Sequence, residues 1–432
     1  MGLTITNIRY GGYFGGMTVV SDAPVGLDGD RLSFRRYLDP LVSVITDPEQ
    51  QTPFTVGVFG AWGSGKSSLL QMLNEQLEKD YSEKFVRVWF DPWTYRGEPN
   101  LLIPLLHTLR DSLDKDTNHR FVESAKKIGE VLLRLGTDLL LKAVTADAVS
   151  VEKLEMLEKQ YLERRFAVES MMRNLRKTLQ EQVNIIYQGG ARLVLLVDDL
   201  DRCDPDQIIA LLDSIKLFLD LEHVFVFLAV DREVIHRGIQ IRYDKFRFAA
   251  GREEVVGYEY LEKMVQLPVE LFPLSGTQIK DLAKLIIPGD EPENIEIRKV
   301  IEKVALPNPR KIKRLLNIFA VVRALMLKDA DLKKLDQLTV LRLVALQVQF
   351  PELYWEIVRL PVGLEVLEKK YVGNLNDTEL QRYYSLQEPL KKLCEKYWIP
   401  GSALGKLFDG SNFSGIGKQM STYLSMLGGA GA

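Results

Sequence analysis

The sequence predicts an α/β fold with a mainly parallel sheet, followed by a region made only of helices. Five short apolar runs, rich in β-branched or aromatic residues and bounded by turn residues, are typical of buried parallel strands. Helical segments separate these runs, as in α/β proteins, and no such run follows Pro273. The expected strands are Phe54–Phe59, Phe85–Phe90, Leu193–Val197, Val224–Val230 and Val265–Leu271.

The same pattern divides the chain into four parts. A helix is expected around Arg31–Ile45 and another from about Lys66 to Glu78. Prolines and Gly373 interrupt the helical pattern after Pro273. The four parts are an N-terminal segment (1–50), a strand-bearing core (51–273) with a charged helical insert at about 116–188, a first helical segment (274–330) and a C-terminal helical domain (331–432).

Composition excludes several classes of protein. The 432 residues carry a net charge of −3, so no overall positive field attracts nucleic acid or an anionic membrane. The chain has only two cysteines, Cys203 and Cys394, and four histidines, with no metal-ligand spacing among them. This usage indicates a reducing compartment, and we expect the protein to be cytoplasmic.

A membrane span is not expected in the insert. The most apolar long window, Val131–Ser150, contains four charged residues. Charges at that density oppose insertion of a helix into a bilayer. The segment Val151–Gln188 is also charged and repeats apolar residues at helical spacing, which indicates a solvated helical hairpin or a partner-binding coiled coil.

Residues 60–67, GAWGSGKS, match the pattern G-x-x-x-x-G-K-S/T between an expected strand and an expected helix. Glycines let the backbone curl so that successive N–H groups converge on phosphate oxygens, and the helix start adds its positive dipole end. Lys66 is suited to bridge the β- and γ-phosphates, and the Ser67 hydroxyl to ligate Mg²⁺. The expected phosphate-binding residues are Gly60, Ala61, Trp62, Gly63, Ser64, Gly65, Lys66, Ser67 and Ser68.

The stretch LLVDDLDRCD ends the third expected strand with acidic residues. Because neighbouring strand residues project to opposite sides, one carboxylate can face the metal while the next faces a water in line with the γ-phosphate. We assign Asp198 to the metal and Asp199 to the water, with Asp201 as the substitute for either role. A helix N-cap cluster is the alternative, and it suits Asp204.

Two further polar groups leave alternatives open. Asp231 and Arg232 end the fourth expected strand, where they would sense a γ-phosphate or cap the next helix. The helix after Pro309 begins with Arg310, Lys311, Lys313 and Arg314. That basic face is a solvated surface, a nucleic-acid patch, or part of a lid that brings an arginine to the phosphates.

Together these motifs resemble the KAP P-loop NTPases, a branch of the STAND group of AAA+-like ATPases. The resemblance spans about residues 20–320 and rests on segments that occur in the family's order. They are GVFGAWGSGKSSLL (the Walker A motif), VWFDPWTYRGEPNL, LLVDDLDRCDPDQI (the Walker B motif), FVFLAVDREVI, YLEKMVQLPVEL and NPRKIKRLLN.

The resemblance implies a P-loop NTPase three-layer sandwich with strand order 5-1-4-3-2 and a helical lid at 274–330. It implies ATP rather than GTP as the nucleotide, and a nucleotide-driven conformational switch. With the Mg²⁺ ligands assigned above, the favoured interpretation is an Mg²⁺-dependent ATPase in which Arg310 reaches the phosphates from the lid. The chain has no guanine-reading N/T-K-x-D motif. Several prokaryotic relatives act in phage exclusion or antiviral defence.

The expected partners are a second copy of the chain or an effector protein. Arg202, Arg232, Arg237 and Arg242 are candidates for an arginine that acts across a subunit boundary. Three other functions remain open at this stage. They are an ATP-dependent nucleic-acid machine, an ATP-binding scaffold without turnover, and a small-molecule kinase.

Overall fold

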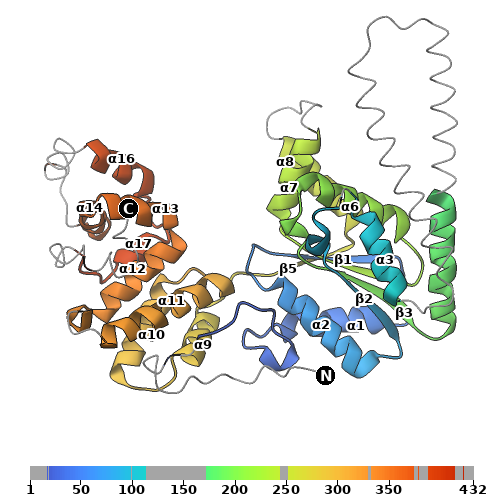
Figure 1. Cartoon of the computed structure of the whole chain (residues 1–432), viewed down its shortest axis with the longest axis horizontal. Coiled ribbons are helices and arrows are strands. Elements are labelled where there is room, and N and C mark those ends of the chain that lie inside the picture. Colours follow the sequence, from blue (N-terminus) through green and yellow to red (C-terminus); the bar gives the residue numbers. More distant parts are fainter. Residues whose placement is uncertain are drawn as a thin grey trace, which may run out of the picture. The chain divides into compact units, whose positions relative to one another are not determined.

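The computed structural model describes residues 17, 19–98, 100–112, 172–243, 252–328, 332–373, 378, 388–413 and 422. The chain forms two compact units. The sheet unit lies within residues 24–272, and the helical unit combines residues from 1–23 and 273–432. Figure 1 shows the elements of each unit along the chain.

The sheet unit contains five parallel strands in the order β2-β3-β4-β1-β5. Read from the other edge this is 5-1-4-3-2, so the expected fold is confirmed. The strands are β1 (Phe54–Phe59), β2 (Phe85–Phe90), β3 (Arg192–Val197), β4 (Val224–Val230) and β5 (Leu267–Glu270). Strand β5 is shorter than expected because Val265 still closes the preceding helix, its N–H donating to the carbonyl of Leu261.

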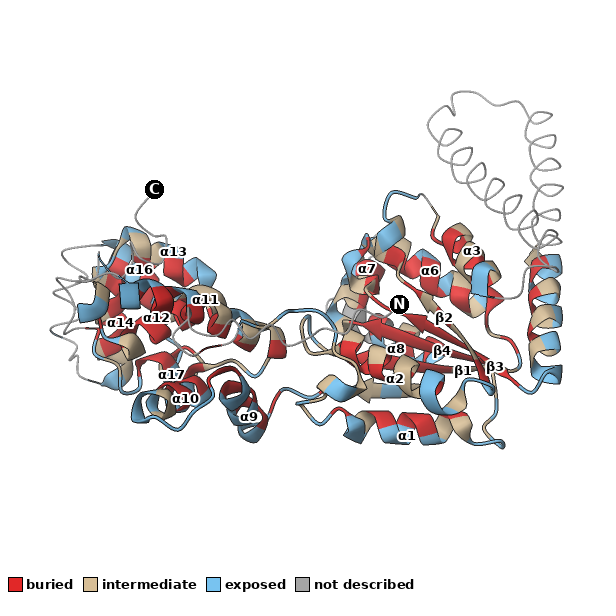
Figure 2. Ribbon diagram, turned by 60° about the horizontal axis from the view of Figure 1, so that its bottom comes forward, coloured by how far each residue is buried: buried red, intermediate tan, exposed pale blue. Residues whose placement is uncertain are grey.

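Helices cover both faces of this sheet, which makes three layers (Figure 2). Alternate strand residues supply the two cores, since Leu193 and Leu195 pack on one side and Val194 and Leu196 on the other. One face packs against α1 (Arg35–Thr46) and α2 (Lys66–Tyr81). The other packs against α3 (Leu102–Ser112), a helix at 172–188, α6 (Pro205–Phe218), α7 (Arg232–Tyr243) and α8 (Arg252–Met264).

Helix α1 begins four residues later than the sequence pattern suggests. The Asp30 carboxylate accepts hydrogen bonds from the backbone N–H groups of Leu32, Phe34 and Arg35. Ser33 has a positive φ of 58°. This capped turn occupies the residues that periodicity alone assigns to the helix.

The described part of the helical unit after Pro273 contains helices and no strand. Prolines start three of these helices, at the first-turn position where a missing N–H costs least. The helices are α9 (Gly276–Ile286), α10 (Pro292–Val304), α11 (Pro309–Lys328), α12 (Gln337–Gln349), α13 (Pro351–Arg359), α14 (Val362–Val372), α16 (Glu388–Tyr397) and α17 (Gly405–Phe408).

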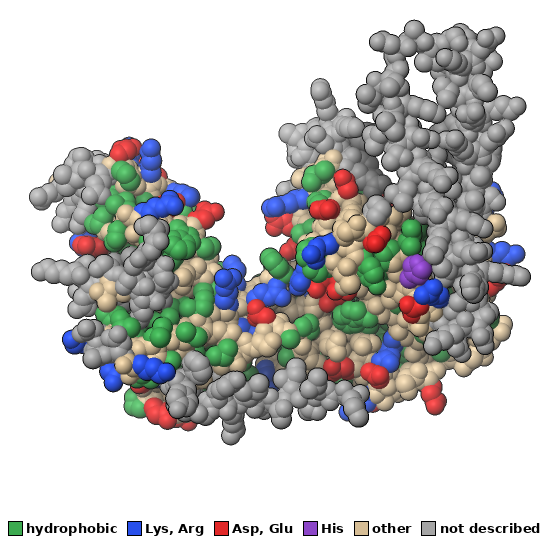
Figure 3. Space-filling view, viewed as in Figure 1, with side chains coloured by type: hydrophobic (Ala, Val, Ile, Leu, Met, Phe, Trp, Pro, Cys, Tyr) green, Lys and Arg blue, Asp and Glu red, His purple; other side chains and the backbone are tan. Residues whose placement is uncertain are grey.

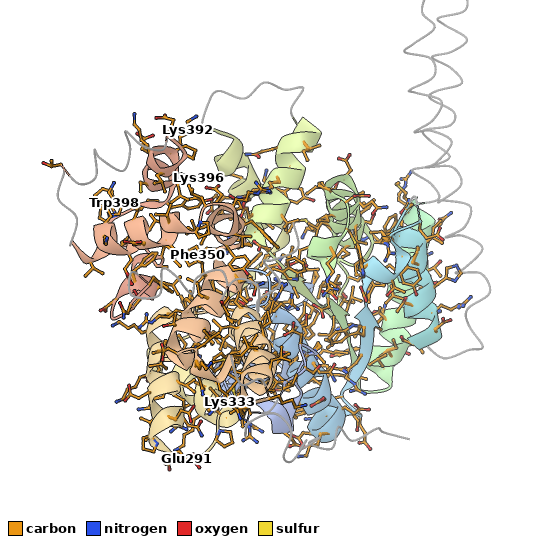
Figure 4. All side chains as sticks on the ribbon, turned by 60° about the vertical axis from the view of Figure 1, so that its left-hand side comes forward. Glu291, Lys333, Phe350, Lys392, Lys396 and Trp398 are labelled. Atoms are coloured by element: carbon orange, nitrogen blue, oxygen red, sulfur yellow. The ribbon has the colours of Figure 1, made fainter. Side chains whose placement is uncertain are left out.

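Several charged side chains on the described part of the helical unit lie close to acidic or aromatic partners. The ammonium of Lys396, which Figure 4 labels, lies 2.9 Å from a carboxylate oxygen of Glu356 and 3.6 Å from one of Glu352. The ammonium of Lys370 lies 4.3 Å from the centre of the Trp398 ring. On the face drawn in Figure 3, acidic and basic side chains are interspersed over the described surface of each unit. A single-sign surface that would track a nucleic-acid backbone is not seen there.

Residues 116–171, which make up most of the helical insert expected at about 116–188, lie outside the described residues. The described end of it, residues 172–188, is helical. Within the described ranges, every helix is too short or too polar to cross a bilayer.

Candidate functional site: a phosphate loop and its acidic strand end

The loop between β1 and α2 has the backbone that its glycines allow. Gly63 and Gly65 have φ angles of 82° and 106°, a region that L side chains rarely adopt. A turn closes the loop, with the Ser64 N–H donating to the Ala61 carbonyl over 3.0 Å. A Cβ on Gly65 would lie 2.4 Å from the ring of Phe34, so the residue that precedes α1 packs closely against the loop.

Lys66 and Ser67 open α2, and their side chains reach different partners. The Lys66 ammonium donates to the Gly60 carbonyl at 2.9 Å and lies 3.0 Å from Oδ2 of Asp201. The Ser67 hydroxyl donates to Oδ1 of Asp198 at 3.0 Å. The fold therefore brings the loop residues Lys66 and Ser67 together with two acids from the end of β3.

Asp198 is buried directly after β3, with 6% of its surface exposed. Its backbone N–H donates to the Phe90 carbonyl, which continues the pairing of β2 and β3. The pKa of Asp198 is raised to about 6, mainly by burial and also by the neighbouring Asp199 charge, while the hydrogen bond from the Ser67 hydroxyl acts to lower it.

Ser67 and Asp198 fit a magnesium ion that is shared with a nucleotide. Mg²⁺ is usually held by one or two carboxylates, substrate phosphates and waters rather than by a cage of protein groups. The described residues contain no cluster of three or more His, Cys, Asp or Glu that could hold a metal ion. A hydroxyl and a carboxylate 3.0 Å apart at the phosphate loop supply suitable oxygen ligands.

Asp199 points elsewhere, for a reason that the strand pattern did not predict. Strand β3 ends at Val197, so alternation along a strand no longer applies at the two acids. Asp199 has a left-handed backbone with φ 52°, and its carboxylate lies 3.0 Å from the Arg202 guanidinium. The two carboxylates diverge because of this backbone turn. The reasoning from strand alternation was wrong, and the role of Asp199 stays a prediction.

A comparison with protein-family models matches residues 34–326 to the KAP family P-loop domain. The chain belongs to the KAP family. The match covers the phosphate loop, Asp198 and Asp199 after β3, and the helical unit from residue 273 to residue 326 in α11.

Two curated relatives resemble parts of this KAP protein. The phage T7 exclusion protein of Escherichia coli strain K12 is 23% identical over 258 residues, which cover 56% of this chain. This chain spans 33% of that relative's length. An uncharacterized protein of Methanocaldococcus jannaschii is 23% identical over 167 residues, covering 32% of this chain and 86% of the relative.

A solved structure also aligns with this KAP chain, at low similarity. Domain III of the replication initiation protein DnaA from Thermotoga maritima has a TM-score of 0.30 and 14% identity. The alignment covers 74% of this chain and 93% of that one.

Other polar residues of the KAP domain take structural positions. The Asp231 carboxylate accepts the backbone N–H of Glu233 at 3.0 Å, which caps the start of α7. Asp91 accepts from the backbone N–H of Trp93 and the hydroxyl of Thr94, so it caps the short 3₁₀ helix η2 (Pro92–Tyr95). An Asp directly before a Pro is a common helix-start signal in a sequence.

Three of the four candidate arginines form ion pairs within the sheet unit. The Arg232 guanidinium also lies 4.1 Å from the centre of the Phe59 ring, at the edge where β1 ends. The side chain of Arg242 lies outside the described residues. The pairs are Arg202 with Asp199, Arg232 with Glu270 and Arg237 with Glu233.

Arg310 lies on the first turn of α11, in the helical unit. Its guanidinium is 3.9 Å from Asp22, which belongs to a segment that runs along the same helix. Two hydrogen bonds between Asn317 and the backbone of Val20 hold that segment in place. Arg314, one turn further along α11, is exposed. Whether Arg310 contacts phosphates stays a prediction.

Asp198→Asn should stabilise the fold by about 1–3 kcal/mol at pH 7.5, since one pKa unit corresponds to about 1.4 kcal/mol. The folded-state pKa of Asp198, about 6, lies above its ordinary value of 3.8. Wild type therefore loses stability as pH rises from about 4 to about 6, and the loss persists above that range. Urea denaturation at several pH values measures this. The difference in the free energy of unfolding between Asp198→Asn and wild type should shrink toward pH 4. A difference that does not change with pH would contradict the raised pKa of Asp198.

Proposed function

We propose that this KAP protein is an Mg²⁺-dependent ATPase that works as a nucleotide-driven conformational switch. One observation carries the proposal. Lys66 and Ser67 of the phosphate loop each contact an acidic side chain at the end of β3, at 3.0 Å in both pairs. In this arrangement Lys66 would bind phosphate oxygens and Ser67 with Asp198 would ligate Mg²⁺. The bound metal would neutralise charge on the β- and γ-phosphates.

The division of the chain into two units supports the proposed switch. The chain crosses between them near residues 23–24 and 272–273. A nucleotide shifts such an equilibrium only as far as it binds one arrangement better than the other. A guanidinium on α11 that meets the γ-phosphate would supply this difference, and Arg310 is our candidate.

A role in antiviral defence is part of the proposal. It rests on the likeness to the phage T7 exclusion protein, which this chain matches over a third of that protein's length. The partner that would read the switch is a second copy of the chain or an effector protein.

The experiment for the proposal combines phosphate release with small-angle X-ray scattering. We expect slow, Mg²⁺-dependent release of phosphate from ATP, and a smaller radius of gyration with a non-hydrolysable ATP analogue than with ADP. Binding of ATP without turnover would indicate the scaffold function instead. Absence of ATP binding would refute the proposal.

Arg310→Ala should leave ADP affinity within a few-fold of wild type, weaken binding of the ATP analogue about 10- to 100-fold, and reduce the compaction. The reason is that a charge-assisted contact to the γ-phosphate is worth roughly 1.5–3 kcal/mol. The exposed Arg314→Ala variant, one turn away, is the matched control. Wild-type turnover and compaction in the Arg310→Ala, Arg314→Ala double variant would show that this basic face is only a solvated surface.

A further inference from the structure

Three acidic residues within four positions each face a different partner. Asp198 accepts from Ser67, Asp199 pairs with Arg202, and Asp201 lies against Lys66. The short 3₁₀ helix η4 (Leu200–Arg202) creates this division, because the fully buried Leu200 anchors the turn and Asp201 follows it. The chemistry described above uses Asp198 and Asp199. It leaves Asp201 without a function.

The contact between Asp201 and Lys66 is a buried ion pair. Their charged atoms are 3.0 Å apart, and each side chain is 7% exposed. Oδ2 of Asp201 accepts no well-aligned hydrogen bond from any described residue, so the nearby ammonium is what balances its charge. Removing one member of a buried ion pair destabilises the fold, because the other charge stays buried without a partner.

The same ammonium is the group that a P-loop offers to phosphates. Lys has three donors and no acceptor, and in this structure Gly60 and Asp201 lie within reach of them. Bound β- and γ-phosphates would compete with the Asp201 carboxylate for Lys66, and the carboxylate would also repel them.

We propose that Asp201 is the internal counter-ion of Lys66 and holds nucleotide affinity down by competing with the phosphates for its ammonium. This rests on the proposed nucleotide binding. The carboxylate would restore the position of Lys66 after phosphate leaves and would keep the release of product fast. Asp201 is thus a positioning residue, distinct from a metal ligand or a base.

Asp201→Asn tests this directly, because it keeps the shape of the side chain and removes the charge. Titration calorimetry should show ADP and a non-hydrolysable ATP analogue binding at least about tenfold tighter than to wild type, which corresponds to about 1.4 kcal/mol. AMP, which has no β-phosphate, should bind as it does to wild type. Asp204→Asn makes the same charge change at an exposed position of the same loop and should leave all three affinities unchanged.

Equal or weaker binding of ADP and the ATP analogue by Asp201→Asn would overturn the proposal. Weakening confined to Mg²⁺-containing buffer would identify Asp201 as a metal ligand instead. If wild type itself binds no nucleotide, the proposed function fails. The proposed competition between Asp201 and phosphates for Lys66 then fails as well. The ion pair is then still measurable by a second experiment that needs no ligand.

The second experiment is a double-mutant cycle on thermal stability without nucleotide. Lys66→Met and Asp201→Asn should each lower the melting temperature, because each leaves a buried charge unpaired. The double variant should melt closer to wild type than either single variant does. Additive losses would overturn the pairing. The cycle also covers the case in which Asp201→Asn is too unstable for the binding experiment, because its melting temperature can still be compared with that of the double variant.

Discussion

Lys66→Ala should lower the affinity for ADP and for a non-hydrolysable ATP analogue by at least about a hundredfold. Loss of one charge-assisted contact accounts for roughly 1.5–3 kcal/mol, or about 10- to 100-fold. A further loss is expected because Asp201, 7% exposed and 3.0 Å from Lys66, would be left as an unpaired negative charge facing the phosphates. Titration calorimetry measures the change.

The control for this variant is Lys79→Ala, at an exposed position in the last turn of the same helix. It should bind as wild type does. Far-ultraviolet circular dichroism should show that Lys66→Ala retains its helices, although its melting temperature should fall. Unchanged nucleotide binding by a folded Lys66→Ala protein would remove the basis for the phosphate-loop assignment.

Asp199→Asn should retain ATP binding and slow hydrolysis by about two orders of magnitude or more, the usual scale for the loss of a positioned base. Asp198→Ala should instead weaken Mg²⁺-dependent binding, because it removes the carboxylate that lies 3.0 Å from the Ser67 hydroxyl. Single-turnover phosphate release and calorimetry with and without Mg²⁺ separate the two effects.

Asp199 is paired with Arg202, so its substitution also breaks an ion pair. Arg202→Gln breaks the same pair and keeps the carboxylate. Turnover within a few-fold of wild type in Arg202→Gln would assign the slow hydrolysis of Asp199→Asn to its carboxylate. Equal slowing in both variants would contradict a role for Asp199 as the base. Reversed behaviour of the Asp198 and Asp199 variants would exchange their assignments.

The sequence alone determined the strands, their parallel arrangement and the phosphate loop. Strands β1, β2 and β4 begin and end at the residues that their apolar runs predict. Such runs are contiguous, and a strand buried on both faces needs no partner information to be recognised. The loop is local too, since its shape follows from the positive φ angles that Gly63 and Gly65 permit. The strand order came from the family resemblance rather than from these runs.

Only the tertiary structure decided which charged and polar side chains contact one another. Ser67 and Asp198 are 131 residues apart, and no local pattern indicates that Asp201, rather than Asp198 or Asp199, lies against Lys66. The pairing of Lys66 with Asp201 depends on the left-handed backbone of Asp199 and on the short 3₁₀ helix η4. These two features bring Asp201 to Lys66 only once the fold places the end of β3 near the loop. Backbone preferences act between neighbouring residues, whereas ion pairs depend on where separate segments cross. The sequence therefore determined the groups available for chemistry, and the packing of the sheet unit assigned their partners.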